Sequence, residues 1–441
     1  MDGDDELTGD AFGLTPETTI RDSLYDLIPL SREAAALLAS GPFLRLDGIQ
    51  QLGFVSRVWP GAKHTRFEHS LGVMHLMRAA LLRLQQHGAG ISSDTARAAI
   101  AAALLHDIGH YPFSHAIEEL GPPVLTHEEV GRRLIVSGEI AGILRDAWRL
   151  EPERVARLIH PGDDPLPDED RLVRGLLSGA LDVDKLDYLP RDARACHVPY
   201  GGVDSARLLD ALRVIEVDGV KRIGIDDKGV SPLHSLINAR QEMFDNVYWH
   251  HTNRACMAML LRAVQEAVIA GLSPEELTRH TDASLIATLS RPEMPAVTRR
   301  LTACLSSRLL HKRAVEISAR SGDLYAYLGS LFHQPARRRD LERAISVELA
   351  RQTGLLADDG DILIDIPKPE RWRTDVWVAF RRPPIGFAPV MAWNDVAGVG
   401  PEHFKQYEEH RRMIRIVVTE PLRDAVRERW DRLLLPLMAG A

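Results

Sequence analysis

Three short segments hold the residues of this chain whose types and spacing could do chemistry. Residues 66–72 read RFEHSLG, residues 105–110 read LHDIGH and residues 182–188 read DVDKLDY. They contribute the candidate metal ligands His69, His106, Asp107 and Asp184. Two imidazoles and two carboxylates suit Mn, Fe, Mg or Zn better than a metal that selects thiolates. A divalent ion with open positions can activate water and polarise a phosphoryl oxygen, so the pattern predicts a metal-dependent hydrolase.

A helix over residues 95–109 would bring part of this set together. Ser92 is a suitable N-cap for an alanine-rich helix that Gly109 would end. On that helix, His106 and Asp107 lie four and three residues before His110 and share a face with it. The helix is apolar on nearly every face, and burying carboxylates and imidazoles without partners is costly. A metal explains these residues better than a buried hydrogen-bond network, which remains the alternative.

The other elements must position these segments. Apolar residues at three- and four-residue steps, followed by Gly88, predict a helix over 71–88. Most of 30–270 has a helical pattern, apart from a hairpin with Asp218-Gly219 at its type I′ turn. A helix starts again at Ser273-Pro274, and strands are expected at 361–366, 376–380 and 413–418, followed by a helix over 420–437.

The predicted fold class is therefore mainly α, a helical core with one β-hairpin and a smaller C-terminal α+β region. Residues 1–20 are acidic and rich in glycine and threonine, which predicts a flexible tail. Residues 21–270 are expected to form the helical domain, and residues 271–441 the C-terminal region.

Composition narrows the functional classes. The chain of 441 residues has a formal net charge of −8, which gives no overall attraction to nucleic acid or anionic lipid. It shows no secretory signal, and no apolar run reaches the ~18 residues that span a bilayer, so no membrane partner is expected. The isolated cysteines, 3 in number, fit neither a disulfide framework nor a thiolate cluster, so we expect a cytoplasmic protein. Arg337-Arg338-Arg339 is interpreted as a solvated helix face rather than a nucleic-acid patch.

The three segments, with YPFSH continuing after His110, resemble the motifs of the HD-domain phosphohydrolase superfamily. Within it they are most similar to the deoxynucleoside triphosphate triphosphohydrolases. The resemblance covers about 25–270 well and the rest loosely. It implies an HD-type helical core in which His69, His106, Asp107 and Asp184 hold one divalent metal ion, Mn, Mg, Fe or Zn.

The resemblance also implies roles for the residues around the metal. The catalytic group would be His115, Glu118 and His127. His115 would act as the acid–base residue, and Glu118 would hold its tautomer. The phosphate-binding group would be Arg66, His110, Lys185 and Arg240. For Arg66, Lys185 and Arg240 the alternative is a salt bridge to a neighbouring carboxylate.

The sugar-binding group implied by the resemblance is Gln51, Leu52, Tyr188, Asp192 and Tyr248. Tyr248 would pack under the deoxyribose and exclude a 2′-hydroxyl, and the alternative is an ordinary core aromatic. Ala39 and Asp47 stand where GTP-activated members carry an aspartate and an arginine. They cannot read a guanine, so activation by GTP at that position is not expected.

The expected function is hydrolysis of a deoxynucleoside triphosphate to the deoxynucleoside and triphosphate. The resemblance further implies a homo-oligomer, a dimer or a tetramer. One alternative is another HD phosphohydrolase activity, on a nucleoside monophosphate, a cyclic nucleotide or an alarmone. The other is a nucleotide-sensing or nucleic-acid-binding protein with little turnover; nucleic acid is a conceivable partner that nothing in the charge pattern indicates.

Overall fold

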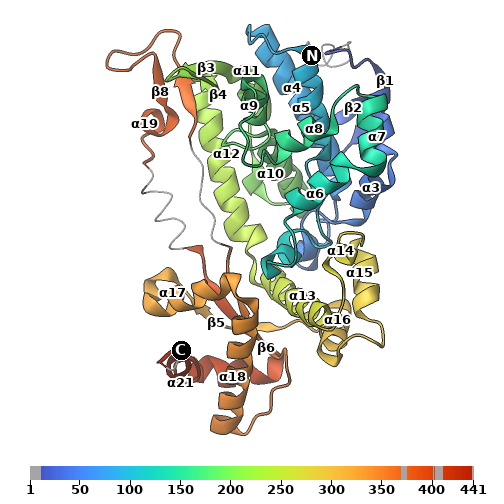
Figure 1. Cartoon of the computed structure of the whole chain (residues 1–441). Coiled ribbons are helices and arrows are strands. Elements are labelled where there is room, and N and C mark those ends of the chain that lie inside the picture. Colours follow the sequence, from blue (N-terminus) through green and yellow to red (C-terminus); the bar gives the residue numbers. More distant parts are fainter. Residues whose placement is uncertain (1–10, 369–374, 401, 403–410, 440–441) are drawn as a thin grey trace.

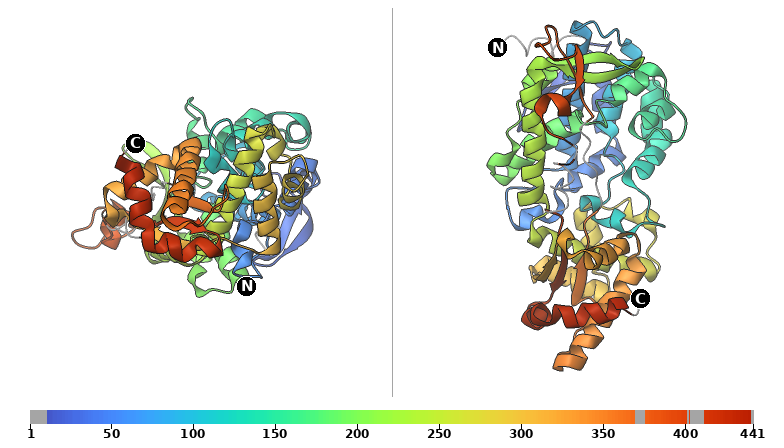
Figure 2. Two further views of the ribbon diagram at one scale, coloured as in Figure 1. Left: turned by 90° about the horizontal axis from the view of Figure 1, so that it is seen from below. Right: turned by 90° about the vertical axis from the view of Figure 1, so that its left-hand side faces the viewer.

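The computed structural model describes residues 11–368, 375–400, 402 and 411–439. It has an elongated shape, with a large helical body above and a smaller lobe below (Figures 1 and 2). We call residues 312–366 and 414–439 the C-terminal lobe. Among the described residues, no helix combines the length and the apolarity that crossing a bilayer requires.

The helical body confirms the predicted mainly α fold class. Its α-helices are α2 (Arg32–Leu38), α3 (Gly41–Leu44), α4 (Arg66–Gln86), α5 (Ser93–Leu105), α6 (His127–Val136), α7 (Gly138–Asp146), α8 (Pro152–Ile159), α9 (Asp168–Arg174), α10 (Val183–Cys196), α11 (Ser205–Ala211), α12 (Val230–Met243) and α13 (His251–Ile269). Short 3-10 turns are η1 (Arg45–Gly48), η2 (Gly53–Arg57), η3 (Ser114–Leu120), η4 (Pro199–Gly201) and η5 (Asp227–Gly229), and η6 (Phe244–Tyr248) is a π turn. The alanine-rich α5 is buried over 95–105 except at Arg97, as its apolar pattern predicts, and its buried apolar residues belong to the main hydrophobic core.

The predicted helix over 95–109 is shorter than expected, because α5 ends at Leu105 and His106 is its C-cap residue. His110 therefore lies in the following loop and not on a shared helical face. The physical reason is a close backbone approach: a Cβ on Gly109 would lie 2.1 Å from the carbonyl oxygen of His127. The chain leaves the helix here to pass against the start of α6, which brings His127 beside the loop.

The predicted hairpin is confirmed, and its turn residues Asp218 and Gly219 both have positive φ angles, 52° and 75°, as a type I′ turn requires. Its strands are β3 (Leu212–Val217) and β4 (Val220–Asp226). A second hairpin, which the sequence did not predict, pairs β1 (Pro16–Asp22) with β2 (Asp26–Ser31). The predicted tail over 1–20 is corrected for residues 11–20, because Phe12 and Leu14 are buried and β1 is paired; residues 1–10 lie outside the described residues.

The later elements include two strands that the sequence did not predict, β5 and β8. The helices are α14 (Pro274–Leu277), α15 (Asp282–Leu289), α16 (Ala296–Ser307), α17 (Asp323–Ser330), α18 (Pro335–Thr353), α19 (Trp393–Ala397) and α21 (Arg423–Ala439), with turns η7 (Ala319–Ser321), η8 (Leu331–His333) and η9 (Glu420–Leu422). The strands are β5 (Lys312–Ile317), β6 (Ile362–Asp365), β7 (Trp377–Ala379), β8 (Val390–Ala392) and β9 (Ile414–Val418). In the C-terminal lobe, β9 lies between β5 and β6, and both pairings are antiparallel.

Two features of the structure do not follow the domain boundary predicted at residue 271. Strand β7 returns to the helical body, where it pairs in parallel with β4 and antiparallel with β8 (Figure 1). Helix α13 belongs to the helical body by sequence, yet it shares one hydrophobic cluster with α16 and with β6 and β9 of the C-terminal lobe. Thus residues after 271 support both parts.

The structure corrects the interpretation of residues 337–339 as a solvated face for Arg338 and Arg339, whereas Arg337 is exposed as expected. Arg338 on α18 is 4% exposed and lies among buried charges, including the ion pair of Arg262 with Glu342. Arg339 forms an ion pair with Glu266 at 3.4 Å. Tertiary packing of α18 on α13 and β6 buries a side chain that the local sequence assigns to solvent.

Candidate active site

Three helices bring the four predicted metal ligands together. His69 lies in the first turns of α4, His106 and Asp107 follow the end of α5, and Asp184 lies in the first turn of α10. Asp184 Oδ1 is 2.9 Å from His69 Nε2 and 3.7 Å from His106 Nε2. Asp107 Oδ1 is 3.4 Å from His106 Nε2, and its Oδ2 is 3.8 Å from His69 Nε2. Ligand atoms around one ion at about 2.1 Å are separated by about 3 to 3.5 Å, so this spacing fits a single metal ion.

The donor atoms themselves also fit a metal. The Nδ1 atom of His106 is 2.8 Å from the carbonyl oxygen of Ala103, which can only accept, so Nδ1 carries a proton and Nε2 faces the ligand group. That Nε2 atom is buried and has no hydrogen-bond partner among the described residues. Buried polar atoms normally have a partner, and a divalent ion would supply one here.

The charged groups around the candidate ligands shift one another's pKa values. Burial acts to raise the pKa of Asp107, but Arg66, His106 and His69 outweigh it and hold that pKa far below its usual range. Burial acts to lower the pKa of His69, but hydrogen bonds with Asp184 and Asp187 raise it to about 10. Without a metal, His69 is therefore protonated at neutral pH, and a metal ion bound to this imidazole would have to displace that proton.

A buried carboxylate behind His69, Asp187, was not singled out from the sequence. Its Oδ2 accepts a hydrogen bond from His69 Nδ1 at 2.7 Å and one from Arg191 Nε at 2.8 Å. Arg191 also pairs with Asp22 of β1 at 2.8 Å. Gly72 makes this arrangement possible, since a Cβ there would lie 1.9 Å from Asp187 Oδ1. The spacing of Asp187 one helical turn after Asp184 was the available signal.

Three histidines form a second group beside the ligands. His110, His115 and His127 have ring nitrogens within 4.8 Å of one another. Glu118 links two of them, since it lies 2.7 Å from His127 Nδ1 and 3.4 Å from His115 Nδ1. Burial opposes ionisation of Glu118, but these hydrogen bonds hold its pKa well below the usual range. Burial and Arg66 lower the pKa of His110, so that imidazole is neutral.

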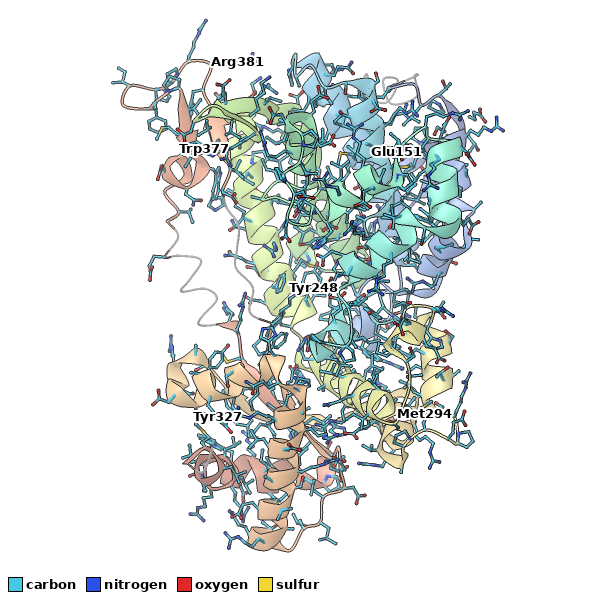
Figure 3. All side chains as sticks on the ribbon, viewed as in Figure 1. Glu151, Tyr248, Met294, Tyr327, Trp377 and Arg381 are labelled. Carbon is cyan, nitrogen blue, oxygen red and sulfur yellow. The ribbon has the colours of Figure 1, made fainter. Side chains whose placement is uncertain are left out.

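A cavity of about 480 Å³ contains both groups. Of the residues predicted from the sequence, it is lined by Gln51, Leu52, Arg66, His69, His106, Asp107, His110, His115, His127, Asp184, Lys185, Tyr188, Asp192, Arg240 and Tyr248. Glu118 is the exception and lies behind the histidines. Gln51 Oε1 is buried and lacks a hydrogen-bond partner among the described residues, as a side chain awaiting a ligand would. Figure 3 places Tyr248 near the middle of the molecule, at the lower end of α12.

The sugar-binding candidates are connected by hydrogen bonds. The Tyr248 hydroxyl donates to Asp192 Oδ2 at 2.7 Å, and Asp192 Oδ1 lies 2.7 Å from His64 Nε2. His64 was not predicted and fixes the second oxygen of Asp192. The Tyr248 ring also meets Phe244 edge-on at 5.3 Å, so its orientation is determined on two sides.

Two of the phosphate-binding candidates have carboxylate partners, which is the alternative that the sequence left open. Arg66 pairs with Asp107, and Lys185 pairs with Asp182. Lys185 Nζ also donates to the carbonyl oxygen of Gly179 at 2.9 Å. Because both cations also line the cavity, these ion pairs are compatible with a further contact to a phosphate oxygen.

The cavity is also lined by residues that the sequence did not indicate. Arg254 lies over the Trp249 ring at 5.4 Å and bonds Asp365 of β6 at 3.0 Å. Glu119 and Lys368 also line the cavity. The C-terminal lobe thus contributes to the cavity indirectly through Asp365, and Lys368, which follows the first segment of the lobe, lines the cavity directly.

Comparison with known proteins agrees with this geometry. A model of the HD domain matches residues 66–192, and a model of the HD associated region matches residues 203–379. The chain is 34% identical over 271 residues to an uncharacterised protein of Methanocaldococcus jannaschii, covering 61% of this chain and 54% of the relative. It is 30% identical over 278 residues to the human deoxynucleoside triphosphate triphosphohydrolase SAMHD1, covering 56% and 44%. The chain thus spans about half the length of the curated relatives it matches.

Two solved structures share the fold over nearly the whole chain. A hypothetical protein from Aquifex aeolicus superposes with a TM-score of 0.70 at 24% identity, covering 94% of this chain and 99% of that one. A phosphohydrolase from Bacteroides thetaiotaomicron gives a TM-score of 0.68 at 24% identity, covering 92% and 100%. At this identity, the likeness establishes the architecture of both parts of the chain.

Proposed function

The chain belongs to the HD-domain phosphohydrolase superfamily, and from that premise we propose that it hydrolyses deoxynucleoside triphosphates to the deoxynucleoside and inorganic triphosphate. The observation that carries the proposal is that one cavity is lined by the metal-ligand group, by the three histidines and by Gln51 and Tyr248. Such a cavity has groups for a phosphate chain and for a sugar side by side.

The proposed metal ligands are His69, His106, Asp107 and Asp184. A divalent ion held there supplies Lewis-acid chemistry at a phosphoryl oxygen. The neutral imidazole of His110 and the guanidinium of Arg66 lie beside the ligands and are suited to bind phosphate oxygens.

His115 is the proposed acid–base residue. Its side chain is 55% exposed within the wall of the cavity, so a bound substrate can reach it. The ionised Glu118 accepts a hydrogen bond from Nδ1, which leaves Nε2 as the nitrogen that exchanges a proton with the substrate. The same carboxylate anchors His127 through its ring and its backbone N–H, at 2.7 and 2.8 Å. Glu118 therefore orients two imidazoles together.

Sugar selection is assigned to Tyr248 and Gln51. Because Asp192 holds the Tyr248 hydroxyl, the ring is a fixed surface against which a 2′-hydroxyl would be crowded or left unpaired. The unpartnered Gln51 Oε1 is a suitable acceptor for a 3′-hydroxyl. Assembly into a homo-oligomer stays part of the proposal, as the family resemblance implies.

Product analysis tests the function. The purified protein is incubated with each deoxynucleoside triphosphate and Mn²⁺ or Mg²⁺, and the released phosphates are separated by ion-exchange chromatography. Inorganic triphosphate is the expected product. Orthophosphate or pyrophosphate as the product would contradict the proposed reaction, and turnover only of a monophosphate, a cyclic nucleotide or an alarmone would favour the first alternative.

His115→Ala separates catalysis from metal binding. The variant should bind the metal as the wild type does and lose ~10²–10⁴-fold in rate, the usual contribution of an acid–base group. The matched control is His333→Ala, because His333 is an exposed histidine of η8 and does not line the cavity. A His115→Ala rate within twofold of the control would refute the catalytic assignment.

A further inference from the structure

Two consecutive residues just before His115 have a backbone conformation that side chains other than glycine seldom adopt. Phe113 has a φ angle of 57° and Ser114 has a φ angle of 61°. Left-handed conformations at non-glycine residues are unfavourable, and they persist only where the surroundings fix them. The pair aims η3, and with it His115, toward the cavity.

A carboxylate from a distant part of the chain fixes this pair. Asp282 Oδ1 accepts a hydrogen bond from the backbone N–H of Phe113 at 2.7 Å. Its other oxygen, Oδ2, accepts from the backbone N–H of Gln50 at 3.0 Å. Asp282 is 8% exposed, so water offers these N–H groups little replacement. One carboxylate thus joins the turn before His115 to the residue before Gln51.

Further contacts lock the same two segments together. Ser114 Oγ donates to the carbonyl oxygens of Gln50 and Gln51 at 3.2 and 3.0 Å. The rings of Phe54 and Phe113 stack at 4.4 Å with an interplanar angle of 11°. Because these contacts lie within the two segments themselves, they hold the segments to each other without any residue from another part of the fold.

Arg45 connects the same parts of the chain through further hydrogen bonds. Its Nη2 atom donates to the carbonyl oxygens of Ile108 and His110, each at 2.9 Å. Its Nη1 atom donates to the carbonyl oxygen of His280 at 3.1 Å. Arg45 therefore fastens the loop after Asp107 to the segment that carries Asp282.

An ordinary capping role does not explain Asp282. It is the first residue of α15, where an acidic side chain could bond its own helix, yet Thr281 already caps that helix by accepting from Ser284 N at 3.3 Å. The Asp282 carboxylate instead accepts hydrogen bonds from two backbone N–H groups outside its own helix. These belong to residues 169 and 232 positions earlier in the chain.

We propose that Asp282 is a positioning residue that sets the placement of His115 and Gln51 in the cavity, and that this is one contribution of the HD associated region to the site. Asp282 lies in the region matched at 203–379, whereas His115 lies in the HD domain match at 66–192. The proposal rests on the proposed function only for the choice of substrate. Burial raises the pKa of Asp282 to about 6, with Arg66 and Arg45 facing it, so the carboxylate is ionised at neutral pH.

The test uses Asp282→Asn in the full chain, since this change keeps the shape and removes one of two acceptor oxygens. The control is Asp323→Asn, because Asp323 is likewise the first residue of a helix and is exposed away from the cavity. Amide hydrogen exchange, bound Mn²⁺ and the rate with dATP are measured for both variants. Exchange needs no substrate, so it decides the proposal even if dATP is not hydrolysed.

For Asp282→Asn we expect exchange to accelerate at least tenfold in peptides covering residues 49–53 and 111–116, with peptides of α4 and α10 unchanged. Bound Mn²⁺ should equal that of the wild type, and kcat should fall about ten- to a hundredfold, as for a misplaced catalytic group. Unchanged exchange in those two peptides would overturn the proposal, and so would acceleration throughout the protein, which would indicate general destabilisation. Unchanged kcat together with accelerated local exchange would overturn it as well.

Discussion

The buried carboxylate behind His69 offers the sharpest test of how the site is built. Asp187 is fully buried and accepts hydrogen bonds from His69 Nδ1 at 2.7 Å and from Arg191 Nε and NH2 at 2.8 and 2.9 Å. Asp187→Asn preserves the volume and removes the charge. We predict two separate losses, one in metal affinity and one in stability.

The metal-affinity loss follows from the contact with His69. A carboxylate that holds a ligating histidine orients the ring and raises its basicity, and removing such a partner weakens metal binding by about 10- to 100-fold. That factor equals about 1.4–2.7 kcal/mol. Because Asp187 also helps to raise the pKa of His69, the variant should show a smaller rise of Mn²⁺ affinity between pH 7 and pH 8 than the wild type.

The stability loss follows from Arg191. Removing one partner of a buried ion pair costs about 3–5 kcal/mol, and here Asp22 remains as the second partner, so we expect the lower end of that range. Asp22→Asn is the matched control. Asp22 bonds Arg191 at 2.8 and 3.3 Å and has no hydrogen bond with His69.

Calorimetric titration with Mn²⁺ gives the affinity, and urea unfolding in the presence of a chelator gives the free energy of unfolding. Both variants should be destabilised, but only Asp187→Asn should bind Mn²⁺ more weakly. Equal Mn²⁺ affinity in Asp187→Asn and the wild type, or equal losses in the two variants, would refute the argument.

Three further predictions concern selectivity, pH and regulation. dATP should be hydrolysed about ten- to a hundredfold faster than ATP, and Tyr248→Ala should narrow that ratio; equal rates in the wild type would remove Tyr248 from sugar selection. Burial lowers the pKa of His250 from its ordinary value of 6.5 to about 4, so the unfolded chain takes up a proton at a higher pH than the folded protein does. Stability should therefore be full above pH 6.5 and decline as the pH falls from 6.5 to 4, and calorimetric melting at pH 7 and pH 5 should show a smaller difference in His250→Gln. GTP should not change the oligomer size or the dATP rate through the position of Ala39 and Asp47, because these side chains cannot read a guanine. The prediction would be contradicted if GTP increased both the oligomer size and the dATP rate and mutation around Ala39 and Asp47 abolished the increase.

The sequence by itself determined the local chemistry and most of the local structure. The turn residues Asp218 and Gly219 specify their hairpin because both tolerate positive φ, and the alanine-rich pattern of α5 specifies a buried helix. The types and order of His69, His106, Asp107 and Asp184 were sufficient to predict a ligand group, and the structure brings their side chains to one place.

Only the tertiary structure decided how that group is held. His69 is held by Asp187, which is supported by Arg191 and Asp22, and the turn before His115 is held by Asp282. In their own local sequence these are ordinary charged residues. Their roles come from side chains meeting across long separations in the chain, such as 118 residues between His69 and Asp187 and 169 between Phe113 and Asp282. Helix propensity and spacing act over a few residues, whereas burial and pairing of charges depend on which surfaces the fold brings into contact. The types of the candidate ligands were therefore readable from the sequence, whereas for their supports the sequence offered no more than the spacing of Asp187 from Asp184.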